Sequence, residues 1–276
     1  MDIINIVVLL FAGLAGGFLA GLLGIGGGAI YAIILLQFAP ELYEADLSQT
    51  QLVQLVVANT IFARFFAALS GCWKQYNMDN FHLPTSLALG IPATIITIGL
   101  IFILEQINYS KIMFQVVFIL IFLPLLYRLF RNNDHTQRLR YEPHTKRYLL
   151  YILGIANGLI TALAGFGGGM IMVPMLSALF NIKLHKIVSI SLTVILIIAF
   201  FTTFFNLFFV QLPTTVPYTI GNISLVLSLP MIVGVTLAAP WGVSTSKKLS
   251  ENTLRKLFIA FCLIMITKTI CDLIFT

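Results

Sequence analysis

The sequence predicts an all-α integral membrane protein, an inverted-repeat helical bundle of about eight full spans plus two short, broken segments after glycine-rich loops. Hydrophobic residues make up 59% of the 276 residues and charged residues only 9%, whereas soluble domains carry roughly 25% charged residues. The apolar stretches are continuous and about 20 residues long, which is typical of membrane helices and not of β-barrels. Two glycine-rich stretches interrupt them at corresponding places in the two halves.

The first half begins with the apolar run Ile3–Leu23, which is long enough to cross a membrane as a helix. Gly13, Gly17 and Gly21 repeat every four residues along it, so they share one helix face and allow a neighbouring helix to approach closely. The run after the first glycine-rich stretch, Ala29–Phe38, is too short to cross roughly 30 Å of hydrocarbon and is predicted to be a half-helix. The remaining spans of this half are predicted at Leu47–Trp73, Leu83–Leu104 and 111–130.

The second half repeats this order of segments. The run Tyr148–Ala164 precedes the second glycine-rich stretch, and the short run Met170–Phe180 follows it. Pro174 is predicted to end or kink the helix of that short run, because proline disrupts helix interiors. Full spans are predicted at Ile187–Gln211, Ile223–Val243 and Leu257–Thr276. The chain thus divides into a first membrane repeat (1–130), a basic cytoplasmic linker (131–147) and a second, inverted membrane repeat (148–276).

Charged residues outside the spans predict how the chain lies in the membrane. Basic loops tend to face the cytoplasm, and the linker is basic, as are Asn181–Lys186 and Ser244–Lys256. Placing these segments inside leaves an acidic loop at 41–46 and the uncharged segment Leu212–Asn222 outside. The net charge of +6 therefore indicates membrane orientation and not nucleic-acid binding. We expect a multi-pass protein of the cytoplasmic (inner) membrane, in contact with lipid.

An internal repeat relates the two halves. Aligning Gly24 with Gly165 also superimposes Gly13 on Gly154 without a gap. Over Ala12–Ala39 this alignment has ten identities in 28 positions. Each half has five segments, an odd number, so the two halves enter the membrane in opposite directions. Inverted repeats with interrupted helices are an architecture of secondary transporters, which bind substrate near the membrane midplane.

The two glycine-rich stretches are the predicted binding site. Glycine has no Cβ, so the backbone there can bend sharply and turn its N–H groups toward a ligand. A helix that begins after such a bend also points its positive dipole end at the gap. Irregular backbone inside a membrane persists only where it is buried in protein or lines a cavity, which favours a buried site for a small anionic substrate. The predicted backbone ligands are Gly24, Gly26, Gly27, Gly28, Gly165, Gly167, Gly168 and Gly169.

Polar side chains inside the spans are the other candidates. Arg64 lies well inside a predicted span, about 15 Å of helix rise from Lys74 at the predicted inner end. It is expected to attract the anion or to form part of a gate; the alternative is a side chain that snorkels to the cytoplasmic surface. Hydroxyl and amide groups could contact the substrate, although in membrane helices they often bond their own backbone. These further candidates are Asn59, Thr60, Ser189, Ser191 and Asn206.

No enzyme motif accompanies the glycines. Neither stretch is followed by the Lys-Ser or Lys-Thr of a phosphate-binding loop, and neither follows a strand as a dinucleotide site requires. Paired carboxylates, an H-E-x-x-H motif and Cys/His clusters are missing from the spans. We therefore expect no catalysis, no metal and no cofactor.

The arrangement of the glycines resembles that of a known family. The chain resembles the TauE/SafE sulfite exporter family, also called the 4-toluene sulfonate uptake permease family, whose signature is G-x-x-G-x-G-G-G-x-x-x-x-P. Gly21 to Gly28 match this pattern in the first half, and Gly165 to Pro174 match it in the second half. The resemblance covers nearly the whole chain, with Ile33 standing where the second copy has Pro174. It implies a secondary transporter, an exporter or permease for sulfite or small organosulfonates.

Other interpretations of the same residues stay open at this point. A site between the two glycine loops fits alternating access, but also a permease or passive channel for other small anions or carboxylates. A membrane assembly factor without a substrate is a further alternative. A coupling ion, H⁺ or Na⁺, and an oligomer are compatible with each of the transport hypotheses.

Overall fold

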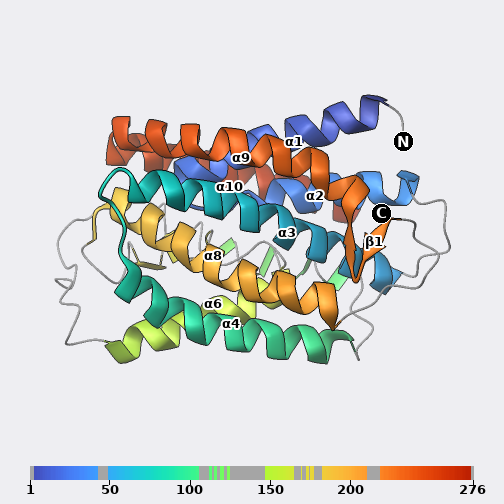
Figure 1. Ribbon diagram of the computed structural model, residues 1–276, viewed down its shortest axis with the longest axis horizontal. Coiled ribbons are helices and arrows are strands. Elements are labelled where there is room, and N and C mark those ends of the chain that lie inside the picture. Colours follow the sequence, from blue (N-terminus) through green and yellow to red (C-terminus); the bar gives the residue numbers. More distant parts are fainter. Residues whose placement is uncertain are drawn as a thin grey trace.

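In the computed structural model, helices run along the long axis of a single bundle (Figure 1). The structure describes residues 3–42, 49–105, 147–164, 182–209 and 218–274, together with 112–113, 115–116, 119–120, 123–124, 169, 172–173 and 175–176. Pro174 and linker residues 131–146 lie outside the described residues, so the predicted kink and the predicted linker stay predictions.

The described helices follow the predicted apolar runs, and the first one has the same bounds as its prediction. They are α1 (Ile3–Leu23), α2 (Gly28–Leu42), α3 (Gln49–Tyr76), α4 (Leu83–Glu105), α6 (Arg147–Ala164), α8 (Leu184–Phe208), α9 (Leu225–Lys248) and α10 (Glu251–Ile274). Five of these described helices, α1, α3, α4, α8 and α9, are long and apolar enough to cross a membrane, and α2 is a shorter apolar helix. A helical, multi-pass membrane protein is therefore confirmed, whereas the predicted total of about eight spans stays a prediction.

A two-stranded hairpin precedes α9, which the sequence did not predict. The strands β1 (Thr219–Ile220) and β2 (Ile223–Ser224) pair antiparallel. Gly221, with a φ of 58°, supplies the left-handed conformation that a tight hairpin turn needs. Ser224 then caps α9, because its hydroxyl oxygen accepts a hydrogen bond from the N–H of Leu227 at 3.3 Å.

The glycine face of α1 packs directly on the backbone of α9. A Cβ on Gly17 would lie 2.7 Å from the Cα of Val235, closer than atoms can pack. Gly13 and Gly21 meet the carbonyl oxygens of Met231 and Ala239 in the same way. The predicted close approach of a neighbouring helix is thus confirmed, and the neighbour belongs to the other half of the chain.

A contact of the same kind joins α6 to α4. Gly154 and Gly158 lie against the backbone of Leu89 and Ala93, and a Cβ on Gly158 would lie 2.9 Å from the Cα of Ala93. In the alignment of the two halves, these glycines are the counterparts of two glycines on the packed face of α1. Each glycine-faced pair therefore joins one helix of the first half to one helix of the second half.

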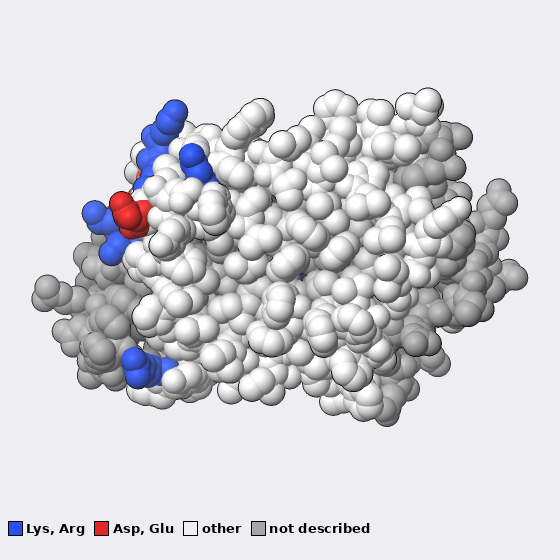
Figure 2. All heavy atoms as spheres, in the orientation of Figure 1, with Lys and Arg blue, Asp and Glu red and all other residues white. Residues whose placement is uncertain are grey.

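The loops predicted to share one side of the membrane lie at one end of the bundle. In Figure 1, α3 and α9 end, and α4, α6, α8 and α10 begin, at this end. The described Lys and Arg residues visible in Figure 2 gather there as well. Lys247 Nζ donates to the carbonyl oxygen of Met78 at 2.6 Å, and Asn80 Nδ2 donates to that of His185 at 3.1 Å. We call it the basic end, and the opposite end, which carries β1 and β2, the hairpin end.

The flanks of the bundle are apolar. Phe200, Phe204 and Phe208 on α8, and Ile95 and Phe102 on α4, each expose more than half of their surface. Between the basic end and the hairpin end, the visible face in Figure 2 is a broad uncharged surface. Such a surface is expected where helices face lipid, since apolar areas of this extent are rare on soluble monomers.

Candidate functional site

The first glycine-rich stretch interrupts the helix between α1 and α2. The N–H of Gly24 donates to the carbonyl oxygen of Ala20 at 2.9 Å and closes α1, while the carbonyl oxygen of Gly27 accepts from the N–H of Ile30 at 3.1 Å and opens α2. Gly24, Gly26 and Gly27 have φ angles of 71°, 75° and 66°. Side chains with a Cβ rarely adopt this left-handed region, so the turn requires glycine.

The turn reverses the chain, so α2 runs back along α1. Gly16 lies against the ring of Tyr31, and a Cβ on Gly16 would be 2.7 Å from the Cζ atom of that ring. Gly16 precedes the turn and Tyr31 follows it, so the two helices form a hairpin with the turn at its tip. A helix of 15 residues such as α2 rises about 22 Å, too little to cross the hydrocarbon alone, as predicted.

The second glycine-rich stretch meets this turn. Gly169, the counterpart of Gly28, is buried, and a Cβ on it would lie 3.0 Å from the carbonyl carbon of Ile25 and in contact with the carbonyl oxygen of Gly24. The described part of the second stretch therefore touches the first, as the hypothesis of a shared site requires. Outside the described residues lie Gly165, Gly167 and Gly168, whose roles stay predictions.

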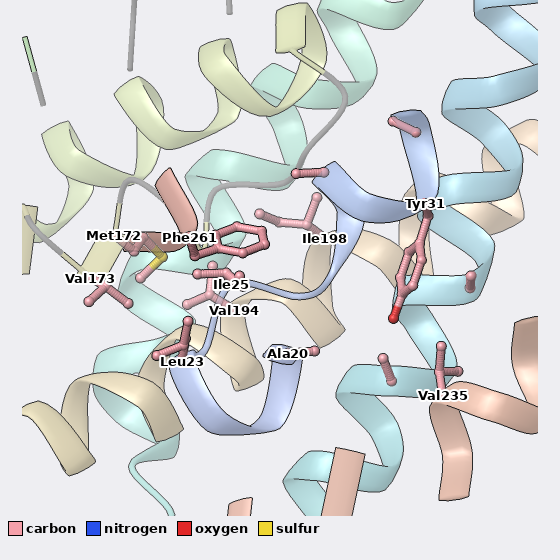
Figure 3. Packing of buried hydrophobic residues seen from close by; sticks show 14 of the residues in the cluster. Ala20, Leu23, Ile25, Tyr31, Met172, Val173, Val194, Ile198, Val235 and Phe261 are labelled. Atoms are coloured by element: carbon pink, nitrogen blue, oxygen red, sulfur yellow. The ribbon is translucent and has the colours of Figure 1, made fainter. Parts of the chain in front are cut away.

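Helix α8 holds the turn in place. Ile25 at its centre is buried in an apolar cluster with Val194, Ile198 and Met172 (Figure 3). Ser191 Oγ donates to the carbonyl oxygen of Gly24 at 2.6 Å. The structure thus brings Ser191, a predicted substrate contact, to the turn, where it stabilises the bent backbone.

Arg64 lies beside the turn and inside the bundle. Its side chain has no exposed surface, so the alternative of an arginine that snorkels to the surface is wrong. A Cβ on Gly26 would lie 3.4 Å from Arg64 Nε and 3.0 Å from Cδ1 of Ile195. Arg64 is near the middle of α3, and Ile195 is near the middle of α8. A buried positive charge therefore borders the glycine turn halfway along the bundle.

Asn59 is a predicted substrate contact whose side-chain amide forms hydrogen bonds within the protein. Its Oδ1 accepts hydrogen bonds from the N–H of Ser224 at 3.0 Å and from Ser228 Oγ at 2.8 Å. Its Nδ2 donates to the carbonyl oxygen of Leu55 at 2.7 Å. The two bonds of Oδ1 fasten α3 to the start of α9 on the hairpin side of Arg64, whereas the bond to Leu55 lies within α3.

The remaining predicted side chains are buried at different levels of the bundle. Ser189 Oγ donates to the carbonyl oxygen of Asn80 at the basic end. Asn206 Nδ2 donates to the carbonyl oxygen of Thr202 at 2.8 Å, within its own helix. The hydroxyl of Thr60 is buried and has no hydrogen-bond partner among the described residues.

Tyr31 is a residue of this site that sequence reasoning missed. It is fully buried, and its hydroxyl oxygen would lie 2.5 Å from a Cβ on Gly27. Its position four residues after Gly27 indicates that it lies near the turn, because side chains on one helix face recur every four residues and lean toward the helix N-terminus. A polar side chain at that position points back at the turn.

Secondary transporters hold a solute at mid-depth by means of interrupted helices, and the turn between α1 and α2 is such an interruption inside the bundle. The class that this fold and site define is the membrane transporters, and comparison with known proteins agrees. Residues 9–269 match the family described as sulfite exporter TauE/SafE, and the chain belongs to that family. The resemblance seen in the glycine motifs is therefore confirmed, and membership of a transporter family accords with the expectation of no catalysis.

Two relatives carry names that also indicate transport. The chain is 23% identical over 250 residues to the "probable membrane transporter protein MJ0441" of Methanocaldococcus jannaschii, with 90% of this chain and 89% of that protein covered. It is 29% identical over 192 residues to the "probable membrane transporter protein YjnA" of Bacillus subtilis, with 66% and 71% covered. No solved structure matches the chain.

Proposed function

We propose that this chain is a secondary transporter that moves sulfite or a small organosulfonate across the cytoplasmic membrane by alternating access. One observation carries the proposal: the backbone break between α1 and α2 lies beside a buried arginine and against the second glycine-rich stretch, with Gly169 against Gly24 and Arg64 Nε next to Gly26. The family description and the names of the relatives support transport. The family description and the hydrogen-bond donors of this site support a sulfur oxyanion as the substrate.

The site offers hydrogen-bond donors to a compact oxyanion. The first N–H groups of α2 have no partner within the helix, and the helix dipole makes them partly positive. Among the described residues, no backbone hydrogen bond uses the N–H of Gly26, Gly27 or Gly28. The guanidinium of Arg64 adds a full positive charge at the same turn. Main-chain donors hold an anion at fixed positions and still allow it to leave, as a carrier requires.

We further propose that the two halves are an inverted repeat, with this site on the pseudo-symmetry axis. The contact of Gly13 with Met231 has a counterpart in that of Gly154 with Leu89. The sequence shift that carries Gly13 onto Gly154 also carries Leu89 onto Pro230, the immediate neighbour of Met231. Equivalent contacts that exchange the halves are expected from a twofold relation between them, which supports the predicted repeat.

Two sets of hydrogen bonds between the halves flank the site, and we assign them as its gates. On the hairpin side, Asn59 bonds residues 222–228. On the basic side, the loop 77–82 bonds His185, Ser189 and Lys247. Opening one set while the other stays closed would expose the turn to one side of the membrane at a time. By the positive-inside rule, the basic end is the cytoplasmic one.

Flux into proteoliposomes tests the proposal. Purified wild-type protein is expected to take up radiolabelled methanesulfonate or sulfite with saturable kinetics, accelerated by unlabelled substrate inside. Gly26→Ala is expected to lower the uptake at least about ten-fold, because it strains a φ of 75° and places a methyl group against Arg64. Gly99→Ala is the matched control, since nothing lies within 4 Å of that Cβ.

Each other outcome overturns a stated part of the proposal. Uptake that never saturates favours a passive channel, and preference for simple carboxylates favours a permease for other anions. No flux of any small anion from well-folded protein would remove the transport assignment. Normal uptake by the Gly26→Ala variant would show that the solute binds elsewhere.

A further inference from the structure

Tyr31 is the starting point, because its hydroxyl group is buried without a hydrogen bond. The residue has no exposed surface, and its hydroxyl oxygen has no hydrogen-bond partner among the described residues. Leaving a buried hydroxyl unsatisfied is unfavourable, and such groups in native proteins call for an explanation. A phenylalanine would fill the same space without this cost, so packing alone does not account for a tyrosine.

The hydroxyl is aimed at the turn that forms the proposed site. Its oxygen would lie 2.5 Å from a Cβ on Gly27 and 2.9 Å from a Cβ on Gly16, so it lies directly against the glycine turn. Arg64 lies against the same turn, with its Nε 3.4 Å from a Cβ on Gly26. Three kinds of hydrogen-bond donor therefore lie at the turn: the Tyr31 hydroxyl, the Arg64 guanidinium and the N-terminal amides of α2.

We propose that the Tyr31 hydroxyl donates a hydrogen bond to the bound anion and selects for a sulfur atom with three oxygens, as in sulfite and sulfonates. The inference rests on the proposed function and names a substrate-selecting residue of that same site. Three oxygens that diverge from one atom can each meet one of the three kinds of donor. An anion with only two oxygens leaves one donor unused, and Tyr31 is a neutral side-chain donor at the turn with no other partner among the described residues.

Two ligands that differ by one oxygen atom test this inference. Methanesulfonate has three oxygens on sulfur, and methanesulfinate has two, with the same methyl group and the same charge. Titration calorimetry on the purified full-length protein in lipid nanodiscs measures both affinities for the wild type and for Tyr31→Phe. The control variant is Tyr151→Phe on α6, whose side chain is 45% exposed.

The wild type is expected to bind methanesulfonate at least about ten-fold more tightly than methanesulfinate, as one hydrogen bond to a charged ligand implies. Tyr31→Phe is expected to lose that preference, with methanesulfinate binding changed less than about two-fold. Removing the ligand oxygen and removing the hydroxyl are thus non-additive, the sign of a direct interaction. Without ligand, Tyr31→Phe is expected to unfold at the same temperature as wild type or higher, because it removes an unsatisfied group.

The outcomes separate the inference from the function on which it rests. Wild-type protein that binds neither sulfur anion overturns both. Wild-type protein that prefers methanesulfonate while Tyr31→Phe keeps the same preference overturns the role of Tyr31 alone. An equal loss of affinity for both ligands in Tyr31→Phe would show that Tyr31 shapes the site and does not select the anion. If Tyr31→Phe does not fold, equal binding of the two ligands by the wild type still overturns the selectivity.

Discussion

Replacing Asn59 with alanine separates a structural role for this residue from a substrate contact. The amide of Asn59 joins α3 of the first half to the start of α9 in the second half. Its Oδ1 accepts from the N–H of Ser224 at 3.0 Å and from Ser228 Oγ at 2.8 Å. Its Nδ2 contacts the carbonyl oxygen of Asn222 at 3.4 Å. All of these residues are nearly or fully buried.

The size of the effect follows from what the substitution leaves behind. Without Oδ1, the buried N–H of Ser224 loses its acceptor, and an unsatisfied buried donor costs roughly 1–3 kcal/mol. The lost bond from Ser228 Oγ adds about 1 kcal/mol. We therefore expect Asn59→Ala to lower the free energy of unfolding by about 2–4 kcal/mol. Ser228→Ala removes a hydroxyl whose single proton is shared between Asn59 Oδ1 and the carbonyl oxygen of Ser224. It leaves the Ser224 N–H satisfied, so its expected cost is about 1 kcal/mol.

Unfolding in mixed micelles, titrated with SDS and followed by tryptophan fluorescence, measures both variants and the double variant. Because the two residues share a bond, the double variant is expected to be more stable than the sum of the single effects implies. Methanesulfonate affinity at temperatures where the protein is folded is expected to change little. Full stability of Asn59→Ala together with a lost methanesulfonate affinity would refute this reasoning and make Asn59 a substrate ligand.

Three further predictions follow from the packing. Gly17→Leu is expected to cost about 3 kcal/mol or more in the same titration, because its Cβ would lie 2.7 Å from the backbone of Val235; an effect no larger than that of Gly99→Leu would contradict it. Gly99→Ala is expected to raise the free energy of unfolding by about 0.5–1 kcal/mol, since that helix position is open; a loss of stability would count against it. Asn80→Ala is expected to speed several-fold the maleimide labelling of buried Cys72 from the basic side, with the other two cysteines replaced by serine; an unchanged rate would show that loop 77–82 is no gate.

The fold was predictable where it depends on local sequence. The length of an apolar run decides whether a helix can cross a membrane, so Ile3–Leu23 was predicted with the bounds that the structure has. Glycines on one face of that run indicated a close helix neighbour, and α9 is that neighbour. The hairpin Thr219–Ser224 was missed because strands of two residues are too short to show an alternating pattern.

The sequence predicted the backbone part of the site, but not which side chains hold it together. The glycine turn and its contact with Gly169 followed from the repeat, since a motif that recurs in two halves marks one place in each. The role of Asn59 did not, because its partner Ser224 is 165 residues away in sequence. The spacing of Tyr31 from Gly27 indicates only that its side chain leans back toward the glycines. Where the hydroxyl lies depends also on the direction in which α2 leaves the turn, which is set by three positive φ angles that only the structure gives.

The two sets of hydrogen bonds bear on how such a site can be opened from either side. Asn59 makes three of these bonds to residues 222–228, and loop 77–82 makes three to His185, Ser189 and Lys247. In the proposed mechanism, each set must break for the site to open to its side. Bonds of this kind contribute about 1 kcal/mol each, so the two sets are of similar strength. Because a ligand shifts an equilibrium only by its differential affinity for the two states, a carrier needs states that lie within a few kcal/mol of each other. Matched gates meet that condition, whereas one much stronger gate would hold the glycine turn open to a single side.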